Sequence, residues 1–406
     1  MSSEAAQRPI AWYRHAPYLL FFPIGGLLAA LGVMPWTAFA FGPGPWRPEL
    51  HAITEVQGAL TCFVVGFLFT FIPRRTGTAP PRSSECFAAL GLVVAPGLLA
   101  LLRHEQAAHL TWGVLALFLA AFVLFRIPPA VRAQKAVAQL LWLPVSFAMG
   151  VGGAMFATLA SPSRPVWMAA LGTSLIWQGV FCGLVMGIGG MLLPMLLHRE
   201  PYKGDVSLRS WVLHAIAAAA FVASFAVEWL IGLRAGYGLR ALVSFLVLLI
   251  AGRMWRWPRA RGLHRRLAWI AVWMLPIGFA CVAIWPVYRI AMLHLVFLSG
   301  FMLLTLSVAS HVAIAHGGRD PLLLVNPPPL FVMGAAVLLA VIARILVSVD
   351  PTRLRLWVGV ASSLFLVALA SWAWWVLPRL KPVHPDEDDR LPPTGPTSRN
   401  LARAGE

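Results

Sequence analysis

Three histidines, His294, His311 and His316, lie along a single apolar stretch that ends at Arg319. The stretch is long enough to cross a membrane as one helix. An ionisable side chain at membrane depth is costly, so it usually faces the interior of a helix bundle and marks a cofactor site or a proton path. Imidazole is also a common ligand of iron, copper and zinc. The stretch therefore predicts a metal or cofactor site, or a proton path, inside a membrane bundle.

The spacing of these histidines divides them between two layers. His294 and His311 are 17 residues apart, which is about 25 Å along a helix, whereas a metal holds an imidazole nitrogen at about 2 Å. His311 and His316 are five residues apart, so they point about 140° away from each other around the helix axis. We expect His294 in one layer and His316 in the other, and we do not expect His311 to be a shared ligand.

His51 and Glu55 strengthen the layer that contains His294. They are four residues apart, so on a regular α-helix they share a face, and the carboxylate could orient the imidazole or relay a proton. Alternatively, Glu55 only stabilises the start of its helix through the helix dipole. His109 begins another apolar stretch at the same end of the bundle and is expected to support the site. His51, His109 and His294 are therefore predicted to converge.

Arg319 has two interpretations. Gly317 and Gly318 suit a left-handed helix end and Pro321 prevents further helix, so Arg319 could be a basic anchor just after a C-cap. It could instead bind an anionic group beside His316, because guanidinium groups form strong charged hydrogen bonds with anions. The sequence is compatible with both roles.

The composition indicates that membrane helices position these residues. The chain has 406 residues, of which 59% are hydrophobic and 12% charged, against roughly 25% charged in soluble domains; its mean hydropathy is +0.77. Backbone polar groups in lipid must be paired within helices or a closed barrel, and the alternating strands of a barrel are not visible. Apolar runs of about 20 residues predict an all-α bundle of about twelve transmembrane helices, near residues 17–40, 51–72, 85–102, 108–126, 134–158, 166–197, 209–231, 238–255, 266–285, 288–315, 329–349 and 355–377.

The basic residues predict the orientation of this bundle. If successive helices alternate in direction, 23 of the 32 Lys and Arg residues fall on the side of the N-terminus. The positive-inside rule therefore places both termini in the cytoplasm. We expect residues 1–380 to form the transmembrane bundle, with the first helix retained as a signal anchor. Residues 381–406 are rich in Pro, Asp, Arg and Ser and are expected to be a disordered cytoplasmic tail.

The net charge of +17 does not indicate nucleic-acid binding. The charges are spread over many short loops beside apolar helices and do not form one basic face. The expected partner is therefore the lipid bilayer, with no nucleic acid; protein partners cannot be read from the sequence.

Three segments resemble the NnrS family. The stretch from His294 to Arg319 is similar to a family signature in which an early histidine is followed by a Gly-His-Thr-Gly-Arg type of ending, here Ala315-His316-Gly317-Gly318-Arg319. Residues 51–58 and 66–77 are similar to its His-x-His-Glu and Gly-Phe-Leu-x-Thr-x-x-Pro-x-x-Thr-Gly elements, and residues 189–194 to its Gly-Gly-Arg-x-x-Pro element. These segments lie on the second, sixth and tenth predicted helices.

The chain departs from that pattern at four positions and is identified as a divergent member. Ile53 stands where the family has a second histidine, Thr54 at its glutamate position with Glu55 one residue later, Met191 in place of an arginine, and His311 where an arginine is usual.

The resemblance implies a haem- and copper-containing protein of the bacterial inner membrane, linked to the response to nitric oxide and nitrosative stress. Nitric oxide or a related small molecule would be its ligand, and turnover is not implied. A haem propionate would be the anion beside His316. Carried over residue by residue, the resemblance gives as cofactor-binding residues His51, His294, His316 and Arg319, with the three histidines as metal ligands.

Two other functions are compatible with the residues alone. A twelve-helix secondary transporter could use histidine and glutamate as proton-coupling groups, but no clear internal repeat is visible and acidic residues in the middle of the predicted helices are nearly absent. An assembly or scaffold subunit would not need His51, His294 and His316. Both alternatives predict a protein without haem.

Overall fold

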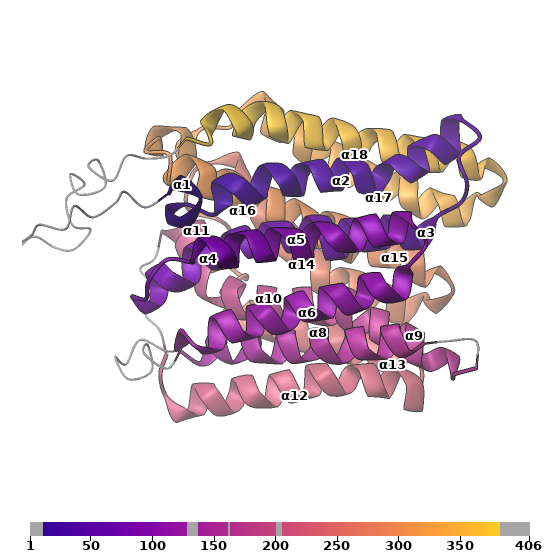
Figure 1. The fold of residues 1–406 in the computed structure, drawn as a ribbon, viewed down its shortest axis with the longest axis horizontal. Helices are drawn as coiled ribbons and strands as arrows, with labels where there is room; N and C mark the ends of the chain where they lie inside the picture. Colours follow the sequence, from indigo (N-terminus) through magenta and orange to yellow (C-terminus); the bar gives the residue numbers. More distant parts are fainter. Residues whose placement is uncertain (1–10, 128–136, 161–162, 200–204, 382–406) are drawn as a thin grey trace, which may run out of the picture.

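A computed structural model describes residues 11–127, 137–160, 163–199 and 205–381. Throughout these ranges the regular structure is helical, and twelve segments are long and apolar enough to cross a membrane. They run side by side along one long axis (Figure 1). The predicted all-helical bundle of twelve membrane helices is therefore confirmed, whereas the predicted disordered tail lies almost wholly outside the described residues.

Five spans consist of two or more helical pieces and seven consist of a single helix. In chain order the spans are α2 (Tyr18–Phe41); α3 (Pro48–Ala52), η1 (Ile53–Leu60) and α4 (Thr61–Thr76); α5 (Ser83–Leu101); α6 (Glu105–Leu124); η2 (Ala138–Leu141) and α8 (Trp142–Leu159); α9 (Val166–Ser174), η3 (Leu175–Val180), α10 (Phe181–Leu184), η4 (Val185–Gly189) and α11 (Gly190–His198); α12 (Leu208–Leu230); α13 (Leu233–Ile250); α14 (Leu263–Ile284); η5 (Pro286–Tyr288), α15 (Arg289–His294), η6 (Leu295–Met302) and α16 (Leu303–Ala315); α17 (Pro328–Val349); and η8 (Pro351–Arg353), α18 (Leu354–Val376) and η9 (Leu377–Arg379). Two short helices, α1 (Trp12–His15) and η7 (Asp320–Leu324), lie outside the spans.

Several spans begin a few residues away from their predicted starts, the eighth and the ninth among them. The eighth begins at Leu233 instead of near residue 238, and the ninth at Leu263 instead of near residue 266. Each follows directly on a glycine with positive φ, Gly232 at 136° and Gly262 at 117°, a conformation that glycine adopts at little cost. Polar residues in the first turns hid these starts from a count of apolar residues.

The second, sixth and tenth spans contain wide π-helical segments, which are η1, η3 with η4, and η6. These spans are also the most enclosed by protein, with 83%, 78% and 61% of their apolar windows buried against at most 56% elsewhere. π segments are rare and often mark functional positions. The three central helices are the ones on which the sequence motifs lie.

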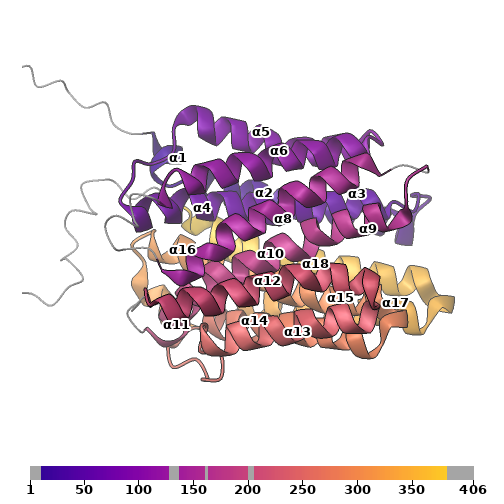
Figure 2. The ribbon, with the colours of Figure 1, turned by 90° about the horizontal axis from the view of Figure 1, so that it is seen from below.

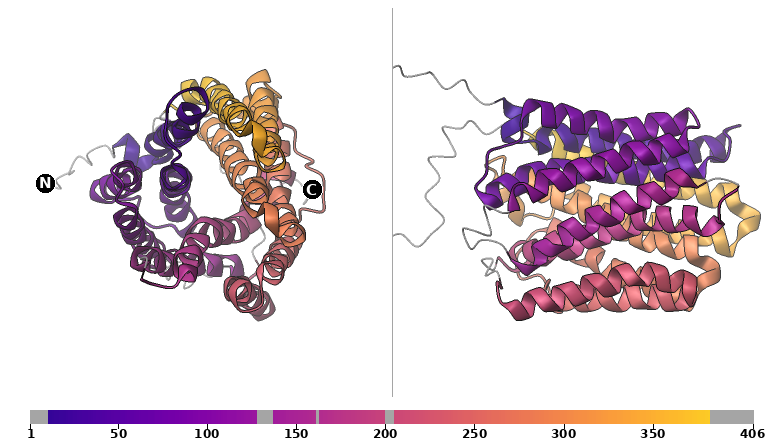
Figure 3. Two further views of the ribbon diagram at one scale, coloured as in Figure 1. Left: turned by 90° about the vertical axis from the view of Figure 1, so that its right-hand side faces the viewer. Right: turned by 60° about the horizontal axis from the view of Figure 1, so that its bottom comes forward.

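The ring of helices closes where the two ends of the chain meet, because α2 packs against α18. The end-on view shows the indigo and yellow helices side by side, and the view from below shows the long helices crossing the same layer (Figures 2 and 3). Twelve crossings bring both ends of the described chain to one end of the bundle, which we call the terminal face. The other end is the opposite face, and His51, His109 and His294 all lie toward it.

Candidate functional site

His51 and His294 occupy equivalent positions on two central spans. Each lies just before a π segment, His51 in α3 before η1 and His294 at the end of α15 before η6. The Nδ1 atom of His51 lies 3.0 Å from the carbonyl oxygen of Gly32. The Nδ1 atom of His294 lies 2.7 Å from the carbonyl oxygen of Ile290. Both rings are therefore held by the protein backbone.

These contacts fix the chemistry of the two rings. A carbonyl oxygen can only accept a hydrogen bond, so Nδ1 must carry the proton in both imidazoles. A neutral imidazole with a proton on Nδ1 keeps the lone pair of Nε2 for a ligand. Metal-binding histidines are usually oriented in this way by a carbonyl or carboxylate on the second nitrogen. His51 and His294 are thus both prepared to coordinate through Nε2.

Arg344 lies toward the same face of the bundle, on a third helix. It lies near the opposite-face end of α17, and α17 packs against α15, which ends at His294. Within the ranges that the structure describes, its side chain forms no hydrogen bond or ion pair. We call His51, His294, Arg344 and Glu55 the opposite-face site.

Glu55 does not make the predicted contact with His51. The carboxylate oxygen Oε1 is buried without a hydrogen-bond partner, and the side chain instead packs on Gly32, where an added Cβ would lie 2.9 Å from Oε1. The prediction assumed a regular α-helix from His51 to Glu55, but the helix widens to a π-helix at Ile53. Because a π-helix bonds residue i to i+5, the one-turn relation between the two side chains is lost.

The hydrogen bond that the structure gives His109 is to Gln57 and not to His51 or His294. On α6, its Nδ1 atom lies 2.8 Å from Nε2 of Gln57, in η1. An amide nitrogen only donates, so Nδ1 accepts and the proton of this neutral ring is on Nε2. His109 therefore has the opposite tautomer to His51 and His294. It supports η1 through Gln57, and its proposed role in the site stays a prediction.

A separate buried network near the same face was missed from the sequence. Arg240 of α13 is fully buried and forms an ion pair with Glu228 of α12. Its guanidinium also donates to Gln178 of η3 at 3.0 Å and to Ser224 at 3.2 Å, and it stacks over the ring of Phe225 at 3.8 Å. Every nitrogen of this buried cation has a partner.

Arg289 connects this network to the span that carries His294. Its Nη2 lies 3.0 Å from Oε1 of Glu228, and its Nε donates to the hydroxyl of Tyr237 at 3.0 Å. Because Arg289 begins α15 and His294 ends it, the network anchors the helix that presents His294. We call Arg240, Glu228, Gln178, Tyr237 and Arg289 the arginine network.

The terminal face holds His316 and Arg319. His316 Nδ1 lies 2.8 Å from Nη1 of Arg74, and its ring lies 5.7 Å from that of Tyr18. Gly318 has φ 66° and the amide of Arg319 donates to Ile314, so the predicted C-cap is confirmed. A metal or anion at His316 and Arg319 stays a prediction. A pocket of about 270 Å³ beside His316 is lined by Phe67, Thr70, Phe71, Arg74, Arg75 and Val312.

His264 and His311 form a pair that the sequence analysis did not anticipate. His264 lies in the first turn of α14 and is only 1% exposed. Its Nε2 is 3.1 Å from Nδ1 of His311. The nitrogen that accepts this hydrogen bond uses its lone pair for it. His311 therefore has a structural partner in His264.

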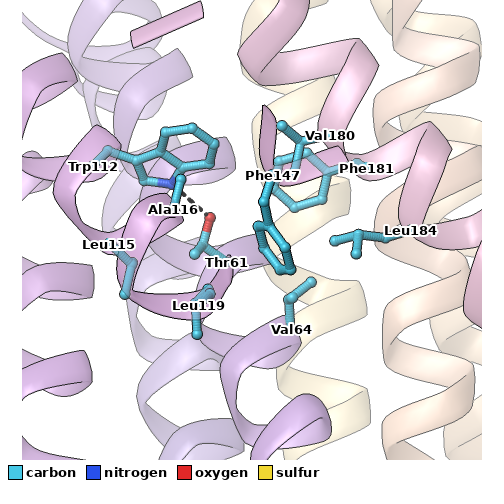
Figure 4. A pocket seen from close by; sticks show the side chains of 10 residues that line it. All are labelled: Thr61, Val64, Trp112, Leu115, Ala116, Leu119, Phe147, Val180, Phe181 and Leu184. Atoms are coloured by element: carbon cyan, nitrogen blue, oxygen red, sulfur yellow. Dashed lines mark hydrogen bonds between the residues drawn. The ribbon is translucent and has the colours of Figure 1, made fainter. Parts of the chain in front are cut away.

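Another small space lies between the second, fourth, fifth and sixth spans (Figure 4). The indole of Trp112 donates to the hydroxyl of Thr61 at 3.0 Å there, while the remaining lining, including Phe147 and Phe181, is apolar. Its volume is about 10 Å³, which is the least that a single water needs. This space is a packing defect and not a site for a cofactor.

In the described part of the chain, potential metal ligands are grouped in pairs at most. No group of three or more His, Cys, Asp or Glu residues there is arranged to hold a metal ion. The four cysteines, Cys62, Cys86, Cys182 and Cys281, are free. The opposite-face site thus offers two imidazole nitrogens, a cation and an orphan carboxyl group.

One signal in the sequence could have revealed more of this arrangement. Arg240, Glu228 and Arg344 lie within apolar spans, where charged residues are rare and functional or paired. The depth of the two arginines inside α13 and α17 separates them from true loop charges.

Comparison with known proteins identifies one family. A family model described as "NnrS protein" matches residues 13–382, nearly the whole chain. No curated protein matches the chain.

Proposed function

Because the chain belongs to the NnrS family, we propose that it binds haem at the opposite-face site through His51 and His294. The observation that supports this most is the shared arrangement of the two rings. Both Nδ1 atoms face backbone carbonyls, which leaves both Nε2 atoms for coordination. Histidines from different helices are a common way to hold haem in a bundle.

The donor set fits haem better than a bare metal ion. Haem brings four nitrogen ligands of its own and needs only one or two from the protein. A tightly bound zinc or copper ion usually takes three or more protein ligands, and no such cluster exists in the described ranges. Copper, which the resemblance also implies, does not fit the residues at this site as a separate ion, and no role is derived from it.

The protein residues around the site would bind and orient the cofactor. The carbonyls of Gly32 and Ile290 hold the two rings in the coordinating tautomer. The indole of Trp36 packs against His51 with ring centroids 5.3 Å apart, which shields that side from water. When bound, haem would supply iron chemistry, and with both imidazoles on the iron a small molecule such as nitric oxide would have to replace one of them.

This proposal includes a cellular setting. We place the terminal face in the cytoplasm, because most basic residues lie on it, and the protein in the bacterial inner membrane. The opposite-face site then lies near the outer surface, where a diffusible gas from outside would arrive first. The family assignment supports a role in the response to nitric oxide and nitrosative stress.

The first test removes one proposed ligand. Protein purified from haem-replete cells is expected to show a Soret band, and His294→Ala is expected to lose most of it while still inserting into the membrane. His104→Ala changes an exposed histidine at the same face and should keep the spectrum. Colourless wild-type protein would contradict the proposal, and metal-free proton-coupled uptake by such protein would favour a transporter.

A further inference from the structure

Two arginines lie well inside membrane spans near the opposite face, and the protein treats them differently. Arg240 has an ion pair with Glu228, hydrogen bonds from its other nitrogens and aromatic rings on its faces. Arg344 on α17 forms none of these interactions with the described residues. A membrane-embedded charge is costly unless it is paired. The guanidinium of Arg344 therefore calls for a partner outside the described residues.

Two acidic groups at this end of the bundle, Asp350 and Glu55, form no ion pair with Arg344. Asp350, six residues further along, accepts hydrogen bonds from Thr352 at 2.5 Å and Trp357 at 3.1 Å and lies 3.9 Å from Arg353. The hydrogen bond from Thr352 and then that from Trp357 lower the pKa of this exposed carboxyl group. Glu55 is packed against Gly32 and its Oε1 has no donor. Neither carboxyl group pairs with Arg344.

The position of Arg344 indicates what its partner is. It lies near the opposite-face end of α17, which packs against α15, and His294 is the last residue of α15. His51 and His294 are the two rings whose Nε2 atoms form no hydrogen bond with the described residues. A ligand that reaches both imidazoles also comes close to this cation. A guanidinium binds carboxylates in a planar, two-point geometry that an ammonium group cannot reproduce.

We propose that Arg344 binds a carboxylate group of the ligand that His51 and His294 hold. This inference rests on the proposed function, in which that ligand is haem, a molecule with two carboxylates. Arg344 then has three effects: it provides the missing counter-charge, fixes the rotation of the ligand in its pocket, and rejects analogues that lack the charge. It is a binding residue and not a metal ligand.

The experiment compares two ligands in protein stripped of its cofactor. Haem and haem dimethyl ester, which lacks both charges, are added to the wild type, and affinity is measured by absorbance titration. The wild type should bind haem at least tenfold more tightly than the ester, because a charge-assisted hydrogen-bonded pair contributes about 1.5–3 kcal/mol. This comparison needs no variant and so does not depend on whether a variant folds.

Variants assign the preference to Arg344. Arg344→Gln should bind haem and ester equally, and Arg344→Lys should retain part of the preference because it keeps the charge without the two-point geometry. Arg353→Gln, which changes an arginine that is 68% exposed on the same face, should behave as the wild type. The readout is the ratio of the two affinities, which a merely structural role of Arg344 would not change.

The outcomes separate this inference from the proposed function. Wild-type protein that binds neither compound overturns the proposed function. Wild-type protein that binds both equally keeps the haem site but overturns the role of Arg344. A preference for haem that survives in Arg344→Gln also overturns the role of Arg344, because the carboxylate must then contact another residue.

Discussion

The opposite-face site and the arginine network lie near the same end of the bundle and use the same residue types, but they differ in how their polar groups are satisfied. In the network, Arg240 and Arg289 share Glu228, and Tyr237 and Gln178 take the remaining donors. Among the described residues of the site, Arg344 has no anion, Glu55 Oε1 has no donor, and neither imidazole has a partner at Nε2. In the network, Oε1 of Glu228 also lacks a hydrogen bond, but it lies 3.0 Å from the guanidinium of Arg289 and so has a counter-charge. The network is therefore closed by protein charges, whereas the site, as we propose, is completed by a ligand.

This contrast distinguishes structure from function inside a membrane. A buried polar group without a partner costs about 1–3 kcal/mol, so a cluster of such groups persists where a ligand supplies the partners. Fully paired groups instead fix the packing of the helices that hold them. The network secures α12, α13 and α15 against one another, and α15 carries His294.

The largest effect is expected from disrupting the arginine network. In Glu228→Gln the two guanidinium groups of Arg240 and Arg289 lose their shared counter-charge in a buried setting, which should lower the free energy of unfolding by about 3–5 kcal/mol. Thermal unfolding in detergent measures the loss. Glu49→Gln changes an exposed acid at the same face and should have no measurable effect. A Glu228→Gln protein as stable as the wild type would show that the negative charge of Glu228 does not stabilise the network.

A smaller effect of opposite sign on stability is expected in the opposite-face site. Arg344→Met removes a cation that has no protein partner and replaces it with an apolar side chain, so the cofactor-free protein should become more stable by about 1–2 kcal/mol. Cofactor-saturated protein should show no such gain, because the variant also loses a ligand contact. Destabilisation of the cofactor-free form would mean that Arg344 has a structural partner, and the comparison would fail.

The smallest expected change concerns the backbone beneath His51. A Cβ added to Gly32 would lie 2.9 Å from Oε1 and 3.0 Å from Cγ and Cδ of Glu55, so Gly32→Ala must displace that side chain and is expected to cost about 1 kcal/mol. The Soret maximum should shift because the carbonyl of Gly32 orients His51. Gly91→Ala on α5 meets open space and serves as the matched control. A stable Gly32→Ala protein with an unchanged spectrum would separate Gly32 from the site.

The sequence alone predicted the helix count and most helix positions, because apolar length is a local property that lipid imposes on every span. It also selected His51 and His294, whose apolar surroundings make them conspicuous. It did not predict the tautomers, because the carbonyl of Gly32 lies on a different span from His51. It paired Glu55 with His51 on the assumption of a regular helix, which the π segment from Ile53 overturns.

The partners of other residues were hidden for the same reason. Arg344, and the contact between His264 and His311, depend on which helices become neighbours in the bundle. Periodicity describes one helix at a time and does not specify that arrangement. The sequence signal that comes closest to revealing these contacts is a charged residue deep in an apolar span. It identifies both Arg344 and Arg240, but it does not tell which of the two has an ion-pair partner in the protein.

The most direct test of a ligand site at His51 and His294 is chemical rescue of His294→Ala with free imidazole. The account predicts that the variant binds haem weakly with an altered spectrum, and that added imidazole restores the wild-type Soret band by occupying the space of the missing ring. His104→Ala should be unaffected by imidazole. Wild-type protein without haem, or a His294→Ala spectrum identical to that of the wild type before any imidazole is added, would contradict the account.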